Sequence, residues 1–145
     1  MTNGETGKRR KLISAAVLVV AAVILTFKFL PIGKTGDAAV ELLDKAIKGK
    51  RPILLFFYAK ICTACLDMEK VIDAIRPQFE NEIAFIKVDY NDNRNAELIK
   101  RFAVLTIPTT FILDNRGRKV QTYVGVKKQQ ELIETLRELL KGKRR

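Results

Sequence analysis

Four stretches of the chain place apolar residues three or four positions apart, the spacing of one face of a helix. The first begins at Ala38, with Asp37 as a suitable N-cap and Gly49 as a suitable end. The second begins at Cys62, and we expect Pro77 to kink or end it. The pattern therefore predicts helices over 38–48, from 62 to about 77, over 95–102 and over 132–140.

Unbroken apolar runs predict strands that are buried on both faces. Two such runs are Ile53–Tyr58 and Ile83–Val88, the second interrupted by Lys87. Two further segments, Thr109–Leu113 and Lys119–Val124, flank the turn sequence DNRG and predict a hairpin. The order α-β-α-β-α-β-β-α predicts an α/β fold, in which a central mixed β-sheet is flanked by helices on both faces.

A different pattern precedes these elements. Residues 12–27 contain no charge, glycine or proline, and the apolar run continues past Lys28 to Leu30. A helix of this length nearly spans the ~30 Å hydrocarbon core of a bilayer. The basic cluster KRRK comes directly before it, so the positive-inside rule places the N-terminus in the cytoplasm. The sequence predicts a cytoplasmic segment at 1–11, a single transmembrane signal-anchor helix at 12–30, a linker at 31–37 and an extracytoplasmic domain at 38–145.

Two other interpretations of residues 12–30 stay open. A cleaved signal peptide would also export the domain, although the apolar run slightly exceeds the usual length and no small-residue cleavage site follows promptly. A buried helix of a soluble protein is disfavoured by the basic flank. The first two interpretations place the domain outside the cytoplasm, where a pair of thiols is readily oxidised.

Composition excludes several kinds of chemistry. The 145 residues include no histidine, which removes Ser-His-Asp and Cys-His nucleophiles and imidazole metal ligands. Two cysteines alone cannot form a four-ligand zinc site, so we expect no metal. The net charge is +11, but the body of the chain shows no basic stripe interleaved with aromatic residues. Nucleic acid is therefore not an expected partner.

The two cysteines, Cys62 and Cys65, stand where a predicted strand passes into a predicted helix. Unpaired backbone N–H groups and the helix dipole favour a thiolate at Cys62, and Lys60 would add to this if its ammonium group pointed toward the sulfur. Cys65, one turn further on, can form or open a disulfide with Cys62. The alternatives are a structural disulfide, which gains little stability from so short a loop, and a Cu(I) site with Met68 nearby.

Four segments together resemble the thioredoxin family in order and spacing. They are PILLFFYAKICTAC, FIKVDYN, LTIPTTFIL and YVGV, and the resemblance covers about residues 38–141. The CxAC motif is similar to that of the C-terminal thioredoxin domain of transmembrane thiol:disulfide interchange reductases. The resemblance implies a thioredoxin fold with a redox-active Cys62–Cys65 disulfide and no other cofactor.

The resemblance also implies roles for individual residues. Cys62 matches the nucleophile, and Cys65 matches the resolving cysteine. The loop that offers backbone groups to a substrate chain corresponds to Ile107, Pro108 and Thr109. Five further positions would support the site: Ile61, Thr63, Ala64, Lys87 and Gly125. From the sequence alone, the alternative for Pro108 is a proline at the start of a strand, and Gly125 is equally a loop glycine.

The surface beside the nucleophile departs from the family's pattern. Ile61 stands where the family usually has a tryptophan, and Thr63-Ala64 replaces a Gly-Pro dipeptide. Tyr58 and Ile61 would give a smaller aromatic presence than a tryptophan does. This difference favours a different or narrower set of partners.

The residues behind the cysteines depart from the pattern as well. Phe56 replaces a buried aspartate that is thought to assist proton transfer at the resolving thiol, so Cys65 would depend on water or on an unassigned group. Lys87 would lack its usual acidic partner and would either be desolvated or extend outward to water. Asp67 and Glu69 are expected on a solvated helix face.

These observations predict a membrane-tethered thiol–disulfide oxidoreductase that runs as a reductase. Its expected partners are exported client proteins with disulfides, a membrane electron-donor thiol reductase and the lipid bilayer. The resemblance alone adds apocytochromes to the expected clients. An oxidase or isomerase of the same fold is one alternative, although strong oxidants of this superfamily tend to carry a histidine between the cysteines. A Cu(I)-handling dithiol module is the other.

Overall fold

Strand β1 (Ile53–Tyr58) lies at the centre of the sheet because its side chains are apolar on both faces. The computed structural model describes residues 38–143, and its four-stranded sheet has the order β2-β1-β3-β4. β1 pairs in parallel with β2 (Ala84–Asp89) and antiparallel with β3 (Thr109–Leu113). β3 pairs antiparallel with β4 (Lys119–Val124), so the sheet is mixed, as predicted.

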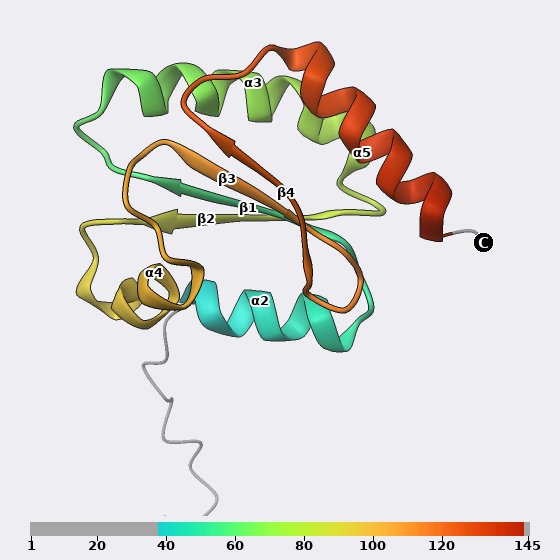
Figure 1. The fold of residues 1–145 in the computed structure, drawn as a ribbon, viewed down its shortest axis with the longest axis horizontal. Coiled ribbons are helices and arrows are strands. Elements are labelled where there is room, and N and C mark those ends of the chain that lie inside the picture. Colours follow the sequence, from blue (N-terminus) through green and yellow to red (C-terminus); the bar gives the residue numbers. More distant parts are fainter. Residues whose placement is uncertain (1–37, 144–145) are drawn as a thin grey trace, which may run out of the picture. The chain divides into compact units, whose positions relative to one another are not determined.

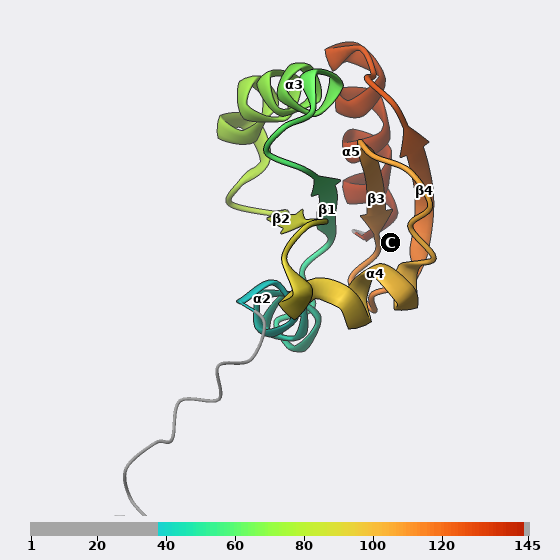
Figure 2. The ribbon, with the colours of Figure 1, turned by 90° about the vertical axis from the view of Figure 1, so that its left-hand side faces the viewer.

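Helices cover both faces of this sheet (Figure 1). One face carries α2 and α4, and the other carries α3 and α5, which is also clear in the perpendicular view of Figure 2. The bounds of the helices are α2 (Ala38–Lys48), α3 (Thr63–Phe79), the short 3₁₀ helix η1 (Asn93–Asn95), α4 (Ala96–Phe102) and α5 (Gln129–Lys143).

The alternation of side chains along β1 divides the core into two layers. Leu55 and Phe57 pack with apolar residues of α2 and α4. Leu54 and Phe56 pack with apolar residues of α3 and α5. Each of these four side chains is fully buried, so both helix pairs are fixed against the same strand.

The order of helices and strands is the predicted one with η1 added, and several boundaries differ, including both ends of α5 (Gln129–Lys143, against 132–140). α3 does not end at Pro77 but continues to Phe79. Proline removes one backbone N–H, yet the helical hydrogen-bond pattern continues past it, and the Glu80 N–H donates to the Arg76 carbonyl at 2.9 Å. Phe79 is buried and holds the last turn against the core. β2 starts at Ala84, one residue later than predicted.

The predicted anchor at 12–30 and the linker at 31–37 lie outside the described residues. Within residues 38–143, every helix is too short or too polar to cross a bilayer.

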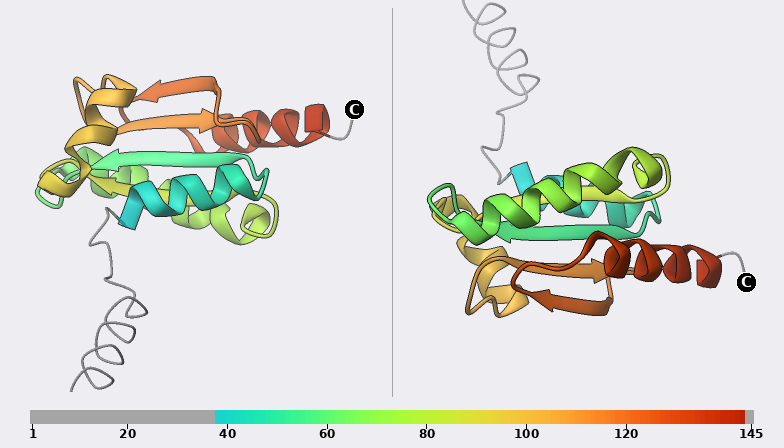
Figure 3. Two further views of the ribbon diagram at one scale, coloured as in Figure 1. Left: turned by 90° about the horizontal axis from the view of Figure 1, so that it is seen from below. Right: turned by 90° about the horizontal axis from the view of Figure 1, so that it is seen from above.

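The sheet topology brings three loops to one end of the domain. β1 and β4 both run antiparallel to β3, so their C-terminal ends lie beside the N-terminal end of β3 (Figure 3). The register shows this directly, because Phe57 and Val124 are the two Cα partners of Thr109. The loops that follow β1, precede β3 and follow β4 therefore meet where α3 begins.

The hairpin turn between β3 and β4 is held by one carboxylate. Asp114 accepts hydrogen bonds from the backbone N–H groups of Arg116 and Arg118, both at 2.9 Å, and from Arg118 Nε at 2.7 Å. Gly117 has φ +75°, and a Cβ there would lie 2.8 Å from Ile47 Cδ1. The sequence DNRG is thus suited to this turn both by its carboxylate and by its glycine.

We predict that Asp114→Asn lowers the free energy of unfolding by about 1 kcal/mol at neutral pH, because charged hydrogen bonds are replaced by neutral ones. Burial works to raise the pKa of Asp114, but the hydrogen bonds from Arg118 and Arg116 outweigh it and hold the pKa below its ordinary value of 3.8. The carboxylate therefore stabilises the fold above the unfolded-state pKa, and this contribution disappears as the pH falls through the lower, folded-state pKa.

Urea unfolding of the wild type and Asp114→Asn between pH 7 and pH 2.5 measures this effect. The difference between the two proteins should shrink in the acidic part of this range. Asp67→Asn is the matched control, because Asp67 pairs with Lys70 on an exposed helix face, where ion pairs contribute little. A difference that stays constant across this pH range would contradict the role given to the Asp114 carboxylate.

Candidate active site

Cys62 and Cys65 form a disulfide at the N-terminus of α3, with their Cα atoms 5.2 Å apart. Cys62 is the N-cap residue, in an extended conformation, and its Sγ accepts a hydrogen bond from the Cys65 N–H at 3.2 Å. The sulfur thus occupies the place that a serine or aspartate oxygen takes in an ordinary cap. A negative charge on Cys62 is favoured there by this N–H group and by the helix dipole.

The two sulfurs differ in how far they are exposed. Cys65 is 1% exposed and belongs to the core between the sheet and α3 and α5. Cys62 is only partly buried, and its neighbours Ile61, Thr63 and Ala64 are exposed. An incoming disulfide can reach Cys62, while Cys65 is shielded and can react only with a partner already bonded to Cys62.

The charge of Lys60, close to Cys62 in the chain, is shared with a carboxylate. Its Nζ atom lies 3.7 Å from Asp89 Oδ2, at the end of β2. The positive charge beside the nucleophile is therefore partly balanced by a carboxylate. The stabilisation of a Cys62 thiolate then depends mainly on the helix N-terminus.

The loop before β3 faces the same end of the sheet. The Ile107–Pro108 peptide bond is cis, and the Pro108 carbonyl accepts a hydrogen bond from the Gly125 N–H at 2.8 Å. Thr109 is buried, and its hydroxyl donates to the Thr106 carbonyl at 2.7 Å. The Thr109 side chain therefore shapes the loop, and the substrate-binding role of the loop stays a prediction. Gly125 has φ +78°, and a Cβ at this position would meet no atom within 4 Å, so the backbone conformation is what requires glycine.

An apolar surface accompanies these loops. Ile61 is 99% exposed, Leu105 before the cis-proline is 93% exposed, and Val126 after Gly125 is 46% exposed. Exposed apolar side chains of this size on three converging loops are suited to contact with another protein. The sequence interpretation missed Leu105 and Val126. The sequence feature that could have identified them is that both are apolar residues in predicted loops, where no helical or strand periodicity explains them.

The predictions for Lys87 and Glu69 were wrong. Lys87 is not without an acidic partner: its Nζ forms a salt bridge with Glu69 and lies 3.8 Å from Asp73 Oδ1. Lys87 is the register partner of Phe56, so its side chain projects from the sheet toward α3, where these carboxylates lie. Asp67, by contrast, lies on the exposed face of α3 as expected.

Phe56 fills the position behind the cysteines with an aromatic ring. It is fully buried, and its ring stacks on that of Tyr58 with centroids 5.7 Å apart. β1 therefore places no carboxylate beneath the buried sulfur. Glu69, one turn beyond Cys65 on α3, is engaged with Lys87.

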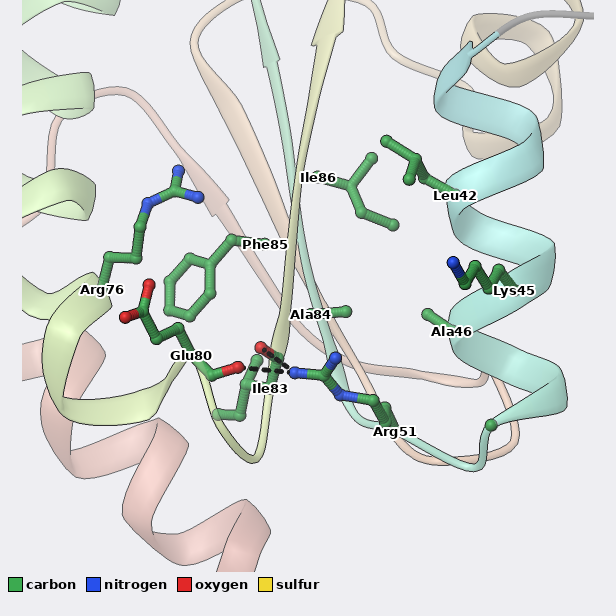
Figure 4. Close-up of a pocket in the computed structure, with 11 residues that line it drawn as sticks. Leu42, Lys45, Ala46, Arg51, Arg76, Glu80, Ile83, Ala84, Phe85 and Ile86 are labelled. Carbon is green, nitrogen blue, oxygen red and sulfur yellow. Dashed lines mark hydrogen bonds between the residues drawn. The ribbon is translucent and has the colours of Figure 1, made fainter.

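A hollow of about 510 Å³ lies elsewhere, along the outer edge of β2 between α2 and α3 (Figure 4). Arg51 crosses it and donates from Nη2 to the carbonyls of Glu80 and Ile83, at 2.6 and 3.0 Å. The cysteines, the cis-proline and Gly125 do not line it. This hollow is therefore separate from the candidate active site around Cys62.

A mixed sheet with a cysteine pair capping the first helix after its central strand, beside a cis-proline loop, defines a thiol–disulfide exchange domain. The comparisons agree with this class. The family model described as Thioredoxin matches residues 35–138. The thioredoxin of Griffithsia pacifica is 31% identical over 99 residues, which cover 68% of this chain and 88% of that protein.

Other similar proteins extend this result. The chloroplastic thioredoxin-like protein HCF164 of Arabidopsis thaliana is 27% identical over 133 residues, covering 89% of this chain and 51% of that protein. The crystal structure of thioredoxin O2 from Arabidopsis thaliana, in its oxidised state, has a TM-score of 0.60 and 25% identity, covering 69% of this chain and 84% of that one. Thioredoxin from Trypanosoma brucei brucei also has a TM-score of 0.60, with 25% identity over 70% and 86% of the two chains.

The chain belongs to the thioredoxin family. Its Cys62–Cys65 pair makes it a thiol–disulfide oxidoreductase.

We predict that, in the reduced protein, iodoacetamide modifies Cys62 much faster than Cys65 at neutral pH, because Cys62 is accessible and its thiolate is stabilised by the helix N-terminus. Peptide mass spectrometry after timed quenching measures the two rates separately. Cys62→Ser should leave a thiol that reacts only slowly, whereas Cys65→Ser should keep the fast one. Equal rates at the two cysteines would contradict the assignment of Cys62 as the nucleophile.

Proposed function

We propose that the protein is a membrane-tethered, extracytoplasmic reductase of disulfides in exported proteins. The observation that carries the proposal is the partly exposed Cys62 at the N-cap of α3, with Cys65 buried one turn behind it. The exposed apolar loops around Cys62 support a protein as the substrate.

In the first step the Cys62 thiolate attacks one sulfur of a client disulfide. A Cys62–client disulfide forms, the client's own S–S bond breaks, and the departing client sulfur takes up a proton. The loop of Ile107 and Pro108 would hold the client chain in an extended conformation beside Cys62. The Cys65 N–H group, which donates to Cys62 Sγ, stabilises the Cys62 thiolate before the attack.

In the second step Cys65 loses its proton and attacks the Cys62 sulfur. The Cys62–Cys65 disulfide forms, and the second client sulfur leaves and is protonated, so the client has gained two electrons and two protons. A donor dithiol at the membrane then reduces the Cys62–Cys65 disulfide by the same exchange in reverse. The protein is thereby returned to its dithiol form.

The tether is supported by the sequence ahead of the domain. Residues 12–30 form an apolar run of membrane-spanning length, and the KRRK cluster comes directly before it. A tether would hold the domain close to a donor in the same membrane and raise the effective concentration of that donor. The direction of reduction is supported by the absence of histidine from the whole sequence, since no imidazolium can stabilise the dithiol form.

We predict that the Cys62–Cys65 couple has a reduction potential near that of thioredoxin, about −270 mV, and far from about −120 mV, the value of the strong periplasmic oxidant. The measurement equilibrates residues 37–145 in glutathione or dithiothreitol redox buffers and quantifies the dithiol by thiol labelling. A value near the oxidant end would contradict a reductase and favour disulfide formation or isomerisation. Failure to form any reversible disulfide would instead favour a Cu(I)-binding dithiol.

We predict that the full chain, expressed in a bacterial host, stays in the membrane pellet after an alkaline carbonate wash. A membrane-impermeant maleimide added to reduced, intact spheroplasts should label it at Cys62, because the domain lies outside the cytoplasm. Residues 38–145 expressed alone should be soluble and unlabelled, and Cys62→Ser should abolish most labelling of the full chain. A shorter, soluble species outside the cell would show a cleaved signal, and an unlabelled full chain would contradict the proposed topology.

A further inference from the structure

One row of register-matched residues crosses the whole sheet beneath α3 and α5. It consists of Lys87 on β2, Phe56 on β1, Thr110 on β3 and Tyr123 on β4. Side chains at paired positions of neighbouring strands point to the same face of a sheet. Phe56 belongs to the packed cluster that contains Cys65, so this row lies on the face that carries the buried sulfur.

Three of the four side chains in this row have a partner for their charge, ring or hydroxyl group. Lys87 pairs with Glu69, Phe56 stacks on Tyr58, and the hydroxyl of Tyr123 forms a 2.6 Å hydrogen bond with that of Thr135 on α5. These contacts satisfy the charges and the hydroxyl at the margins of the row. Thr110, beside Phe56 in the interior, is the exception.

Thr110 is 1% exposed, and its Oγ1 atom has no hydrogen-bond partner among residues 38–143. A buried hydroxyl without a partner costs about 1–3 kcal/mol relative to a satisfied one. Valine has nearly the same shape as threonine and would avoid this cost. Such groups are few in folded proteins, and each requires a reason, such as a role in redox chemistry or an ordered water.

We propose that Thr110 is a positioning residue for Cys65, and that its hydroxyl donates a hydrogen bond to the Cys65 sulfur in the dithiol form. When the disulfide is reduced, two electrons enter, the S–S bond breaks, and the two sulfurs separate because unbonded atoms repel at bonding distance. Cys62 is partly exposed at the edge of the cluster that covers this face, while Cys65 is buried within it. In this proposal the Cys65 sulfur moves toward the row on separation, where Thr110 offers an O–H group.

This hydrogen bond would stabilise the Cys65 thiolate, but the Thr110 hydroxyl would not accept the proton of Cys65 as a carboxylate does. With Phe56 on β1, no carboxylate from that strand can take the Cys65 proton. The proton leaves to water, and the Thr110 hydroxyl stabilises the resulting thiolate by a charge-assisted hydrogen bond. At the margin of this face Lys87 pairs with Glu69 and lies 3.8 Å from Asp73, which also pairs with Arg76, so two positive charges face two negative ones there.

The inference rests on thiol–disulfide exchange at Cys62 and Cys65, and it holds for either direction of electron flow. A hydroxyl that is bonded only in the dithiol form stabilises that form. Removing it should therefore make the reduction potential more negative. Because the oxidised form loses an unsatisfied hydroxyl at the same time, the two effects have the same sign.

The test measures the reduction potential of Thr110→Val, Thr110→Ala and Thr110→Ser in glutathione redox buffers. We expect the valine and alanine variants to shift the dithiol–disulfide equilibrium about tenfold toward the disulfide, which is about 30 mV for a two-electron couple. Thr110→Ser keeps the hydroxyl and should retain the wild-type potential. The matched control is Thr122→Val, because Thr122 is an exposed threonine of β4 paired with Phe111, on the opposite face.

An unchanged potential in Thr110→Val, or a less negative one, would overturn the inference and leave the hydroxyl as a ligand of a buried water. If Thr110→Ser shows the same shift to a more negative reduction potential as Thr110→Val, the inference is also overturned, since the hydroxyl is then not the cause. The wild-type potential tests the proposed reductase, whereas the difference between wild type and variant tests Thr110. The two can therefore fail separately.

Discussion

The position of Cys62 at the first turn of α3 is the constraint on which the rest of the site depends. β1 is buried on both faces, so the chain must leave the sheet at Tyr58 and return over it as a helix. This return places Cys62 at the N-cap and carries Cys65 beneath the helix, where it is 1% exposed. One local arrangement thus produces an accessible sulfur that is stabilised as a thiolate and a shielded sulfur that can react only with it.

The sheet beneath this pair avoids a buried charge. An ionised carboxylate on β1 would be desolvated by the cores on both faces, and Phe56 removes that cost. The charges that remain, on Lys87 and Glu69, lie at the margin of the sheet, with about a third of each side chain exposed. Desolvation is smaller there, and each charge has a partner. A hydroxyl at Thr110 is the most polar group that the interior of the row retains, and a neutral hydroxyl is far less costly to bury than an ion.

The sequence predicted those parts of the molecule that depend on local patterns. The two-sided apolar run of β1 and the DNRG turn predicted the strands, and the placement of Cys62 between strand and helix predicted the site. The pairing of Lys87 with Glu69 was missed because the two residues are 18 positions apart and meet only where α3 packs over the face of the sheet on which Lys87 lies. The end of α3 was missed because burial of Phe79 outweighs the hydrogen bond lost at Pro77. Leu105 and Val126 follow no helical or strand periodicity, and only the folded structure shows that both are exposed on loops that meet beside Cys62.

The fold accelerates exchange without choosing its direction. The hydrogen bond from the Cys65 N–H is present in the disulfide and becomes stronger when Cys62 carries a charge, so it favours the dithiol. Burial of Cys65 works the other way, because it disfavours a second thiolate. A few such interactions set the reduction potential, since a change of about 30 mV is a tenfold change in the dithiol–disulfide equilibrium. Only about 90 mV separates the potential of thioredoxin from that of protein disulfide isomerase. A reductase and an isomerase can therefore differ by two or three hydrogen bonds around one pair of sulfurs, within a single unchanged fold.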